Sequence, residues 1–592
     1  MLRRGDAPLL GGWLDFLAAS VEAASRRDLV GPVRVVVAGT GGSAPTSDED
    51  DPRREPFDSC VVRTFPLASS RSDCHNELFA SADGCDFVLL ASPAAVLSRN
   101  CLGDLLLAIG DPEVGLAEAR QLPLESRKEY DADDGCTSWA SSTCCVVRRR
   151  VIDAVGGFDA ATFPGEGADV DLSWRARLAG WLVRRAPTAT VLVRSHTAAG
   201  HGEDAREPAS GQVKLLLVAK YGGAPVAQAL AGAWAVQGTE RQRMAAADFE
   251  QRRVERGVPE LAEGSPADLL PEALALEEPL DPRDELPAPI AEEPAPTVAP
   301  RGNGRAAASA HGPESEPVVG ERAPFLSVVL RTQGRRPLTL HDVLFSLSAQ
   351  TCQDFEVLLV GHDLGEEGEA AVDEVLADLP PAFLARIRSL PARGGGRARP
   401  LNVALDEACG RYVAFIDDDD VAFDCWVEAF RLVADAHPGS VVRTRTVRQY
   451  GWTEPTMGVD LWRPLEPPEA SEAQFNLLGH VQQNGTAICA LAVPAECFRD
   501  PGLRFREDLP VLEDWDLVLK LAQRRPIRST GLVSVLQRLG TAGGSWEVHT
   551  GEEWDLARSM IWDELEAGSF VVRGEYLPQV RAALDELDDL RG

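Results

Sequence analysis

The sequence predicts an α/β protein with two globular domains, each built on a mostly parallel sheet, joined by a disordered acidic linker. Apolar runs of strand length alternate with helical stretches up to about residue 221 and again from residue 324 to about 571. This alternation is typical of βαβ units. A tract rich in Pro, Ala and acidic residues separates the two regions and has too little apolar surface to fold. At 592 residues, the chain is long enough for two to four domains.

The composition shifts divide the chain into five segments. They are a first α/β domain, a helical extension, the linker, a second α/β domain and a C-terminal helix, at 1–235, 236–257, 258–322, 323–571 and 572–592.

The second domain has the clearer pattern. Its expected elements are a strand, a helix, a strand, a helix and a strand, at 325–330, 338–350, 355–360, 369–376 and 412–416. Ligands of parallel sheets bind beyond the carboxyl ends of the strands. Thr332, Asp363 and the aspartates Asp417 to Asp420 follow three such ends. We therefore expect these side chains to converge on one crevice.

Four consecutive aspartates, Asp417 to Asp420, close the third of these strands. Two like charges about 4 Å apart repel by roughly 4 kcal/mol at an effective dielectric constant near 20, so a cation is expected beside them. Hard oxygen ligands favour Mg²⁺ or Mn²⁺, which commonly bridge carboxylates and substrate phosphates. The alternative is a solvated acidic turn, which is what acidic runs usually are.

A second acidic group, Glu513-Asp514-Trp515-Asp516, precedes an amphipathic segment and resembles the first turn of a helix. Acidic residues there stabilise a helix by a few tenths to about 1 kcal/mol through its dipole. A carboxylate at a helix start that faces the crevice could also accept a proton from an attacking hydroxyl. Both interpretations can hold together.

The ordered motifs of the second domain resemble family 2 glycosyltransferases with the GT-A fold. The segments that carry this resemblance are Ser327–Thr332, Ser346–Thr351, Asp354–Val357, Arg399–Asn402, Tyr412–Asp420 and Glu513–Leu517. The resemblance implies inverting transfer of a sugar from a nucleoside-diphosphate donor, with Mn²⁺ or Mg²⁺ as cofactor. It implies a role for each candidate residue: Asp417 and Asp419 bind the metal in a DxD pattern, Asp514 is the catalytic base with Glu513 beside it, and Thr332, Asp363, Arg399, Asn402 and Asp418 contact the donor.

The second domain departs from the family pattern at three places. Gly361-His362-Asp363-Leu364 stands where the family usually has two aspartates followed by Gly-Ser, so only Asp363 remains to hold the nucleobase. Arg331-Thr332 replaces the usual Pro-Thr of the opening strand. Near the end, Gly543-Gly544-Ser545 and His549 lie where relatives close a loop over the donor. A lone His is more often a surface or packing residue than a ligand.

The first domain resembles a degenerate copy of the second. Its block around Asp169 to Arg177 is similar to the acceptor-side segment of rhamnosyltransferase-like relatives. However, Ala91 to Ala95 stand where the metal aspartates should follow a strand, and Ala168 replaces the Glu of the ED pair. Nothing near Met1 matches the opening strand Leu326–Leu330, so one core strand is missing or trimmed. Gly39 to Ser43 favour a turn over a phosphate loop, because no Lys-Ser/Thr follows. We interpret this domain as catalytically inactive.

Composition narrows the partners and the compartment. The net charge of −33 argues against nucleic acid or an anionic membrane surface as a general partner. The start of the chain does not resemble a signal peptide, and Val213–Val236 is too interrupted for a membrane-spanning helix. The 12 cysteines form no CxxC pairs, so neither a zinc site nor a disulfide framework is expected. A reducing cytoplasm, including the inner face of the plasma membrane, is the expected location.

The favoured function is an inverting hexosyl- or deoxyhexosyltransferase of surface polysaccharide synthesis. It would act on a glycan or lipid-linked acceptor, and a lipid-linked acceptor would bring the chain to the membrane periphery. The alternative is a non-catalytic scaffold that binds nucleotide sugars or glycans. A nucleotidyltransferase also uses paired carboxylates, but it would need a better glycine-rich loop than Thr332-Gln333-Gly334.

Overall fold

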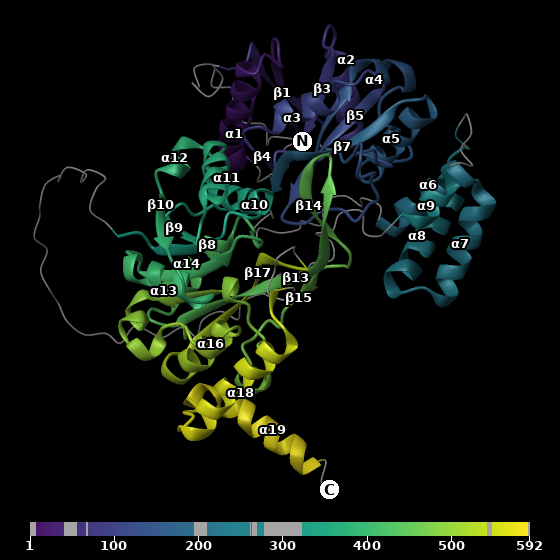
Figure 1. Cartoon of the computed structure of the whole chain (residues 1–592). Helices are drawn as coiled ribbons and strands as arrows, with labels where there is room; N and C mark the ends of the chain where they lie inside the picture. The colour runs from purple at the N-terminus through teal and green to yellow at the C-terminus, as the bar shows by residue number, and fades with distance from the viewer. Residues whose placement is uncertain are drawn as a thin grey trace, which may run out of the picture.

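A computed structural model describes the chain over eight ranges, which are 7–40, 56–66, 69–194, 210–260, 262, 269–276, 323–540 and 548–589. Strands and helices alternate in both halves, which confirms the predicted α/β class. Figure 1 shows the first half in purple and blue, the second half in green and yellow, and a helical group set to one side of the first half.

The second half is built on one mixed sheet of ten strands. Its parallel part is β10-β9-β8-β11, and antiparallel pairing of β11 with β16 joins this part to the rest, in the order β16-β13-β17-β12. Strands β14 and β15 pair with β13. The strands are β8 (Leu326–Thr332), β9 (Phe355–His362), β10 (Ile387–Ala392), β11 (Tyr412–Asp417), β12 (Val421–Ala422), β13 (Val441–Thr456), β14 (Val459–Pro464), β15 (Glu469–Ala470), β16 (Leu491–Pro494) and β17 (Ile527–Leu539).

Helices cover both faces of this sheet, which explains the continuous apolar runs of its central strands. In β8, Val328, Val329 and Leu330 are fully buried. One face packs against α10, α11 and α14, and the other against α13 and α16. The helices of this half are α10 (Pro337–Ser348), α11 (Glu366–Ala377), α12 (Pro381–Leu384), α13 (Ala398–Glu407), α14 (Trp426–Ala436), α15 (Leu477–Gln482), α16 (Glu513–Arg524), α18 (Gly551–Ala567) and α19 (Leu577–Asp589).

The first half repeats part of this topology. Its five-stranded sheet has the order β3-β6-β5-β7-β4, and its strand directions match those of β11-β16-β13-β17-β12. A separate parallel pair, β1-β2, corresponds to β9-β10. No strand in the described part of this half corresponds to β8. The strands are β1 (Arg34–Thr40), β2 (Ser59–Phe65), β3 (Phe87–Ala91), β4 (Ala95–Leu97), β5 (Val114–Leu122), β6 (Cys144–Arg148) and β7 (Leu182–Val193).

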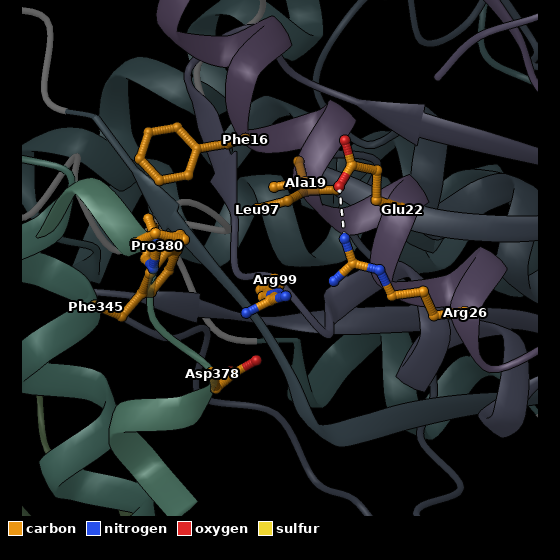
Figure 2. A pocket seen from close by; sticks show the side chains of 10 residues that line it. Phe16, Ala19, Glu22, Arg26, Leu97, Arg99, Phe345, Asp378 and Pro380 are labelled. Atoms are coloured by element: carbon orange, nitrogen blue, oxygen red, sulfur yellow. Dashed lines mark hydrogen bonds and ion pairs between the residues drawn. The ribbon is translucent and has the colours of Figure 1, made fainter. Parts of the chain in front are cut away.

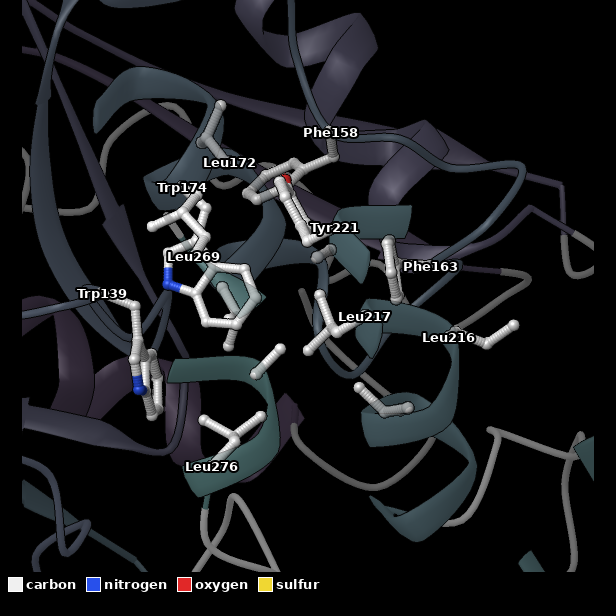
Figure 3. Close-up of a cluster of buried hydrophobic side chains, with 14 of the residues drawn as sticks. Trp139, Phe158, Phe163, Leu172, Trp174, Leu216, Leu217, Tyr221, Leu269 and Leu276 are labelled. Atoms are coloured by element: carbon white, nitrogen blue, oxygen red, sulfur yellow. The ribbon is translucent and has the colours of Figure 1, made fainter. Parts of the chain in front are cut away.

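The helices of the first half include a group that follows its sheet in the chain. In order, the helices of this half are α1 (Ala7–Arg26), α2 (Arg71–Ser81), α3 (Cys101–Ala108), α4 (Arg149–Val155), α5 (Ala168–Leu178), α6 (Ser210–Gly222), α7 (Ala224–Gln237), α8 (Glu240–Arg256) and α9 (Leu270–Ala275). Figure 3 shows how Trp174 and Tyr221, from α5 and α6, meet among buried side chains.

Helix α9 corrects the predicted linker, which was drawn from 258 to 322. Leu269, Ala273 and Leu276 are buried against the core of the first half. Their spacing places them on one helix face. Glu272 also pairs with Arg177 of α5 at 2.5 Å. Proline content concealed this short apolar face. Residues 277–322 of the predicted linker lie outside the described ranges.

The two halves share a buried interface made from equivalent elements of each. Phe16 of α1 meets Phe345 of α10 edge to face, with ring centroids 6.5 Å apart. Val96 of β4 and Leu192 of β7 join side chains of β12 and β17 in one apolar cluster. A cavity of about 150 Å³ lies in this seam, between α1 and the segment around Pro380 (Figure 2). Beside this cavity, the seam buries apolar side chains of both halves in one cluster.

The β13-β14 hairpin extends the second half toward the first half (Figure 1). At its tip, the Met457 amide donates to the Ala132 carbonyl at 2.9 Å. Arg463 of β14 lies over the Tyr130 ring, 4.5 Å from its centroid, and also pairs with Glu129. Sequence reasoning treated this region only as part of the second domain.

The interface also contains a histidine with a raised pKa. Burial acts to lower the pKa of His341, but the carboxylates of Asp342 (4.0 Å) and Asp378 (2.8 Å) raise it from 6.5 to about 9. Its charged form therefore stabilises the fold fully below about pH 6.5, and this contribution is lost as the pH rises through about 9.

We expect the thermal midpoint of the wild type to fall between pH 6.5 and 9.5 by more than that of His341→Gln. The neutral amide cannot contribute a pH-dependent charge at this site. Differential scanning calorimetry at several pH values measures the difference. Parallel curves for the two proteins would contradict the expectation.

No helix in the described ranges is both long enough and apolar enough to cross a bilayer.

Candidate active site

The predicted convergence of strand ends is present in the sheet. Asp417, the last residue of β11, lies beside Arg331 of β8 in parallel register. Thr332 is next to Gly361 of β9, and His362 is next to the end of β10. The carboxyl ends of four parallel strands therefore form one edge, at the position where α/β sheets bind ligands.

Asp417 is held by a two-pronged arginine contact. Arg331 donates from Nε to Oδ1 at 2.7 Å and from Nη2 to Oδ2 at 3.2 Å. Burial acts to raise the pKa of Asp417, but the charges of Arg331 and Arg397 hold it below its usual value. Asp417 is therefore ionised and paired.

Asp418 and Asp419 share a second arginine, Arg336, the residue that precedes α10. Arg336 donates to one carboxylate oxygen of each. The other oxygen of Asp418 accepts from the Thr332 hydroxyl at 2.6 Å. Burial raises the pKa of Asp418 to about 6 against the opposing charge of Arg336.

Asp420 differs from the other three aspartates. It is buried, and burial raises the pKa of its carboxyl well above the usual range. Its carboxyl group forms a hydrogen bond with the Cys489 thiol. The run of four is therefore a group of three carboxylates with arginine partners and one interior carboxyl group.

The second acidic group starts α16, as predicted, and it meets the first. Leu512, just before the helix, has a left-handed backbone with φ of 66°. A non-glycine residue in that region is strained and often lies at a functional site. Glu513 accepts from Arg331 at 3.0 Å and from Arg397 at 3.2 Å. Arg331 thus contacts both Asp417 and Glu513.

Asp514 is positioned as a base would be. Its Oδ2 accepts from the Asn484 amide at 2.9 Å, and its Oδ1 accepts from the Trp515 backbone amide at 2.8 Å. Burial and the neighbouring charge of Glu513 raise the pKa of Asp514 to about 6. The Trp515 indole donates to the His480 carbonyl at 2.6 Å, which anchors this turn.

The other predicted donor residues lie at the same edge but have structural partners. Asp363, with φ of 50°, accepts from the Gly394 amide at 2.9 Å. Arg399 pairs with Glu507 at 3.4 Å. Asn402 holds the backbone of Phe505 through both its amide nitrogen and its oxygen. Within the described ranges, none of these three residues is seen to bond to the aspartates after β11. Their roles in binding a donor stay predictions.

Two further predictions concern the end of the chain. His549 lies just before α18, with its Nδ1 3.4 Å from the Glu553 carboxylate. Gly543 to Ser545 lie outside the described ranges.

Sequence reasoning missed the roles of four residues, which are Arg331, Arg336, Arg397 and Asn484. Arg331 carried a signal, because it replaces the usual Pro of the family pattern. The others contact partners far along the chain, so no local pattern marks them.

The carboxylates are of the chemical type that binds a hard divalent cation, but their present partners are arginines. Oxygen donors of Asp417 and Asp419 are the class that Mg²⁺ and Mn²⁺ prefer. Yet each of the two carboxylates accepts hydrogen bonds from an arginine. In the described ranges, no group of three or more His, Cys, Asp or Glu side chains is arranged to hold a metal ion. A metal ion at these carboxylates would compete with the arginines for their oxygens.

The corresponding edge of the first half lacks these groups. Its strand β3 ends at Ala91, without a carboxylate. Asp169, at the start of α5, accepts from the amide and hydroxyl of Ser142 at 2.9 and 3.0 Å, much as Asp514 accepts from Asn484. A buried Lys128–Glu118 pair lies nearby in this half, with the lysine 3.9 Å from the Trp139 ring centroid.

Comparison with known proteins finds a family model similar to part of the second half. The model described as "Glycosyl transferase family 2" matches residues 327–490. The uncharacterized glycosyltransferase EpsJ of Bacillus subtilis is 25% identical over 198 residues, which are 32% of this chain and 54% of that protein. An uncharacterized glycosyltransferase of Rickettsia felis is 23% identical over 235 residues, 38% of this chain and 36% of that one. The chain thus spans about half the length of the first relative and about a third of the second.

Solved structures of S. aureus TarS also match. Residues 1–349 of TarS in complex with UDP-GlcNAc are 19% identical, with 36% of this chain and 58% of that chain covered and a TM-score of 0.28. The UDP complex is 17% identical, with 43% and 77% covered and the same TM-score of 0.28. These scores are too low to establish a shared fold. The sequence match alone shows that residues 327–490 are similar to the glycosyl transferase family 2 model.

Proposed function

We propose that the second domain transfers a sugar from a nucleoside-diphosphate sugar to a hydroxyl group of a glycan or lipid-linked acceptor, with inversion at the anomeric carbon. One observation carries the proposal: Arg331 contacts both Asp417 and Glu513. Asp417, at the candidate phosphate end, and Glu513, the neighbour of the candidate base Asp514, therefore lie together at one edge of the sheet.

The chain's own residues suggest how the reaction would proceed. Asp514 would accept the proton of the acceptor hydroxyl, which is a poor nucleophile at neutral pH. Asn484 and the Trp515 amide keep its carboxylate oriented. Thr332 and Arg336 orient Asp418 at the donor side.

The metal belongs to this proposal. Mn²⁺ or Mg²⁺ held by Asp417 and Asp419 would offset negative charge on the leaving diphosphate. Family membership, the oxygen ligands and the position at the strand ends support it.

The finer predictions rest on the family resemblance. The transferred sugar would be a hexose or deoxyhexose, and the product would enter a surface polysaccharide. The protein would act in the cytoplasm, at the inner face of the plasma membrane when its acceptor is lipid-linked. The first domain, 1–235, would be an inactive copy that binds acceptor glycan or a partner chain.

A panel of nucleoside-diphosphate sugars tests the activity. We expect the protein, supplied with Mn²⁺, to release nucleoside diphosphate slowly from one donor, because water can replace a missing acceptor. Asp419→Asn should reduce this release at least 10-fold by removing one metal oxygen. Asp435→Asn is the matched control, since Asp435 pairs with Arg411 at the opposite end of β11.

The same assay separates the enzyme from the scaffold alternative. The carboxylates of Asp417 and Asp419 accept hydrogen bonds from arginines. This arrangement favours a protein that binds the donor without transferring its sugar. Donor binding with equal background release from wild type and Asp419→Asn would support the scaffold and contradict the enzyme.

A further inference from the structure

Two arginines stand where a metal-bridged diphosphate would bind, and this suggests a second role for them. We propose that Arg331 and Arg336 hold the carboxylates after β11 closed in the empty protein and turn onto the donor's diphosphate when a divalent cation arrives with it. The cation and the nucleotide would then bind as a pair, each weakly without the other. This inference rests on the proposed function and names residues that control its first step.

The hydrogen bonds of the two arginines would compete with a cation for the carboxylates. Arg331 covers both oxygens of Asp417, and Arg336 contacts Asp418 and Asp419 together. A cation on Asp417 would compete with Arg331 for both carboxylate oxygens, and a cation on Asp419 would compete with Arg336 for Oδ2. Their side chains are only 13% and 24% exposed, so a cation that displaced them alone would leave buried positive charges without partners. Leaving a buried charge unpaired is costly.

The charges of the site oppose binding of a diphosphate alone. Five carboxyl groups line it, Asp417 to Asp419, Glu513 and Asp514, against three guanidinium groups, Arg331, Arg336 and Arg397. An added diphosphate would meet a surplus of negative charge. When cation and diphosphate arrive together, their charges offset each other, so the carboxylates can bind the cation while the arginines bind phosphate oxygens.

The position of the arginines allows this exchange without backbone movement. Arg331 is the penultimate residue of β8, in the centre of the sheet, and Arg336 precedes α10. Both side chains are long, and their planar forks match phosphate oxygens as well as carboxylates. A rotation of side-chain torsions can therefore transfer each fork from one anion to the other.

The test measures Mn²⁺ binding, not turnover. Electron paramagnetic resonance of free Mn²⁺ gives the affinity for Mn²⁺ alone and in the presence of UDP, GDP or dTDP. For Arg331→Met, we expect at least 3-fold tighter binding of Mn²⁺ alone, because Arg331 no longer competes with the cation for the carboxylate of Asp417. We expect at least 10-fold weaker binding of the nucleotide with Mn²⁺, because a phosphate ligand is gone.

Controls separate this effect from a general loss of charge or fold. Arg411→Met removes the same charge at the opposite end of β11 and should leave both affinities unchanged. Arg336→Met, at the more exposed of the two arginines, repeats the test if Arg331→Met fails to fold.

Opposite changes in the two affinities support the proposal, and any other pattern overturns it. Weaker or unchanged binding of Mn²⁺ alone in both arginine variants would mean that the arginines do not compete with the cation. Unchanged nucleotide affinity would mean that they do not bind the diphosphate. If no nucleotide binds to any form, the proposed function fails, and the Mn²⁺ measurement still decides whether the arginines close the carboxylates.

Discussion

Replacing Asp514 by Asn is expected to lower kcat for sugar transfer by about 10²- to 10⁴-fold, the typical contribution of a positioned general base. Asparagine keeps the size of the side chain, and its oxygen can still accept from the Trp515 amide that orients Asp514. It cannot accept the proton of the acceptor hydroxyl. The donor KM should change little, because the carboxylates after β11 are intact.

The pH profile gives the same residue a second signature. Burial and Glu513 raise the pKa of Asp514 to about 6, and a base acts only when ionised. The wild-type rate should therefore fall as the pH drops through about 6, rather than near the ordinary value of 3.8. In Asp514→Asn the fall near pH 6 should become shallower, and the part that is left reports Asp418, whose pKa is also about 6.

Measurement requires initial rates over pH 4.5 to 8 with the donor that the panel identifies. Asp508→Asn is the matched control, because Asp508 pairs with Arg506 at 2.7 Å on an exposed turn before the same helix. A wild-type rate for Asp514→Asn would remove it from the mechanism.

The sequence could predict both ends of this site because each end has a local signature. Asp417 follows a buried apolar run, which marks a strand end, and Asp514 begins an amphipathic segment, which marks a helix start. Their convergence followed from the general rule that ligands bind at the carboxyl ends of parallel strands.

The partners of these residues could not be predicted in the same way. Arg331 meets Asp417 because β8 and β11 are neighbours in the sheet, and it meets Glu513 because α16 covers that edge. Strand order and helix placement are tertiary facts that no single segment carries. The sequence predicted a cation beside the aspartates, and in the structure two guanidinium groups occupy that position.

The first half illustrates a different limit. The sequence shows alanine at Ala91 and Ala168, where the family resemblance would place acidic residues, since motif positions are local. The packing of the first half against the second half could not be read from the sequence, because the interface joins elements far apart in the chain. Helix α9 was missed for a related reason: only packing against α6 makes its short apolar face visible.

The largest stability effect is expected at Asp342, in the middle of that interface. Arg120 of the first half donates to both of its oxygens, at 2.8 and 2.5 Å, and Arg538 of β17 donates at 2.9 Å. All three side chains are at most 1% exposed. Burial acts to raise the pKa of Asp342, but the two arginines hold it well below its usual range.

Asp342→Ala should therefore cost about 3 to 5 kcal/mol, the usual effect of breaking a buried ion pair by removing one partner. Two guanidinium groups would stay buried without their carboxylate. Scanning calorimetry should show the single wild-type transition shifting down and dividing, as the two halves begin to unfold separately. Asp435→Ala, which breaks the exposed Arg411 pair, should change stability by no more than about 1 kcal/mol. Equal effects of the two substitutions would contradict this account.

The position of Asp342 also links this interface to the site. Helix α10 carries Asp342 in its second turn, and Arg336 is the residue that caps its start. The first half, through Arg120, therefore holds the helix that presents Arg336 to Asp418 and Asp419. A domain without a carboxylate at the end of β3 can still act on the site in this way. Asp342→Ala should consequently weaken the closure of those carboxylates at temperatures below its unfolding transition, which the affinity for Mn²⁺ alone would report as tighter binding.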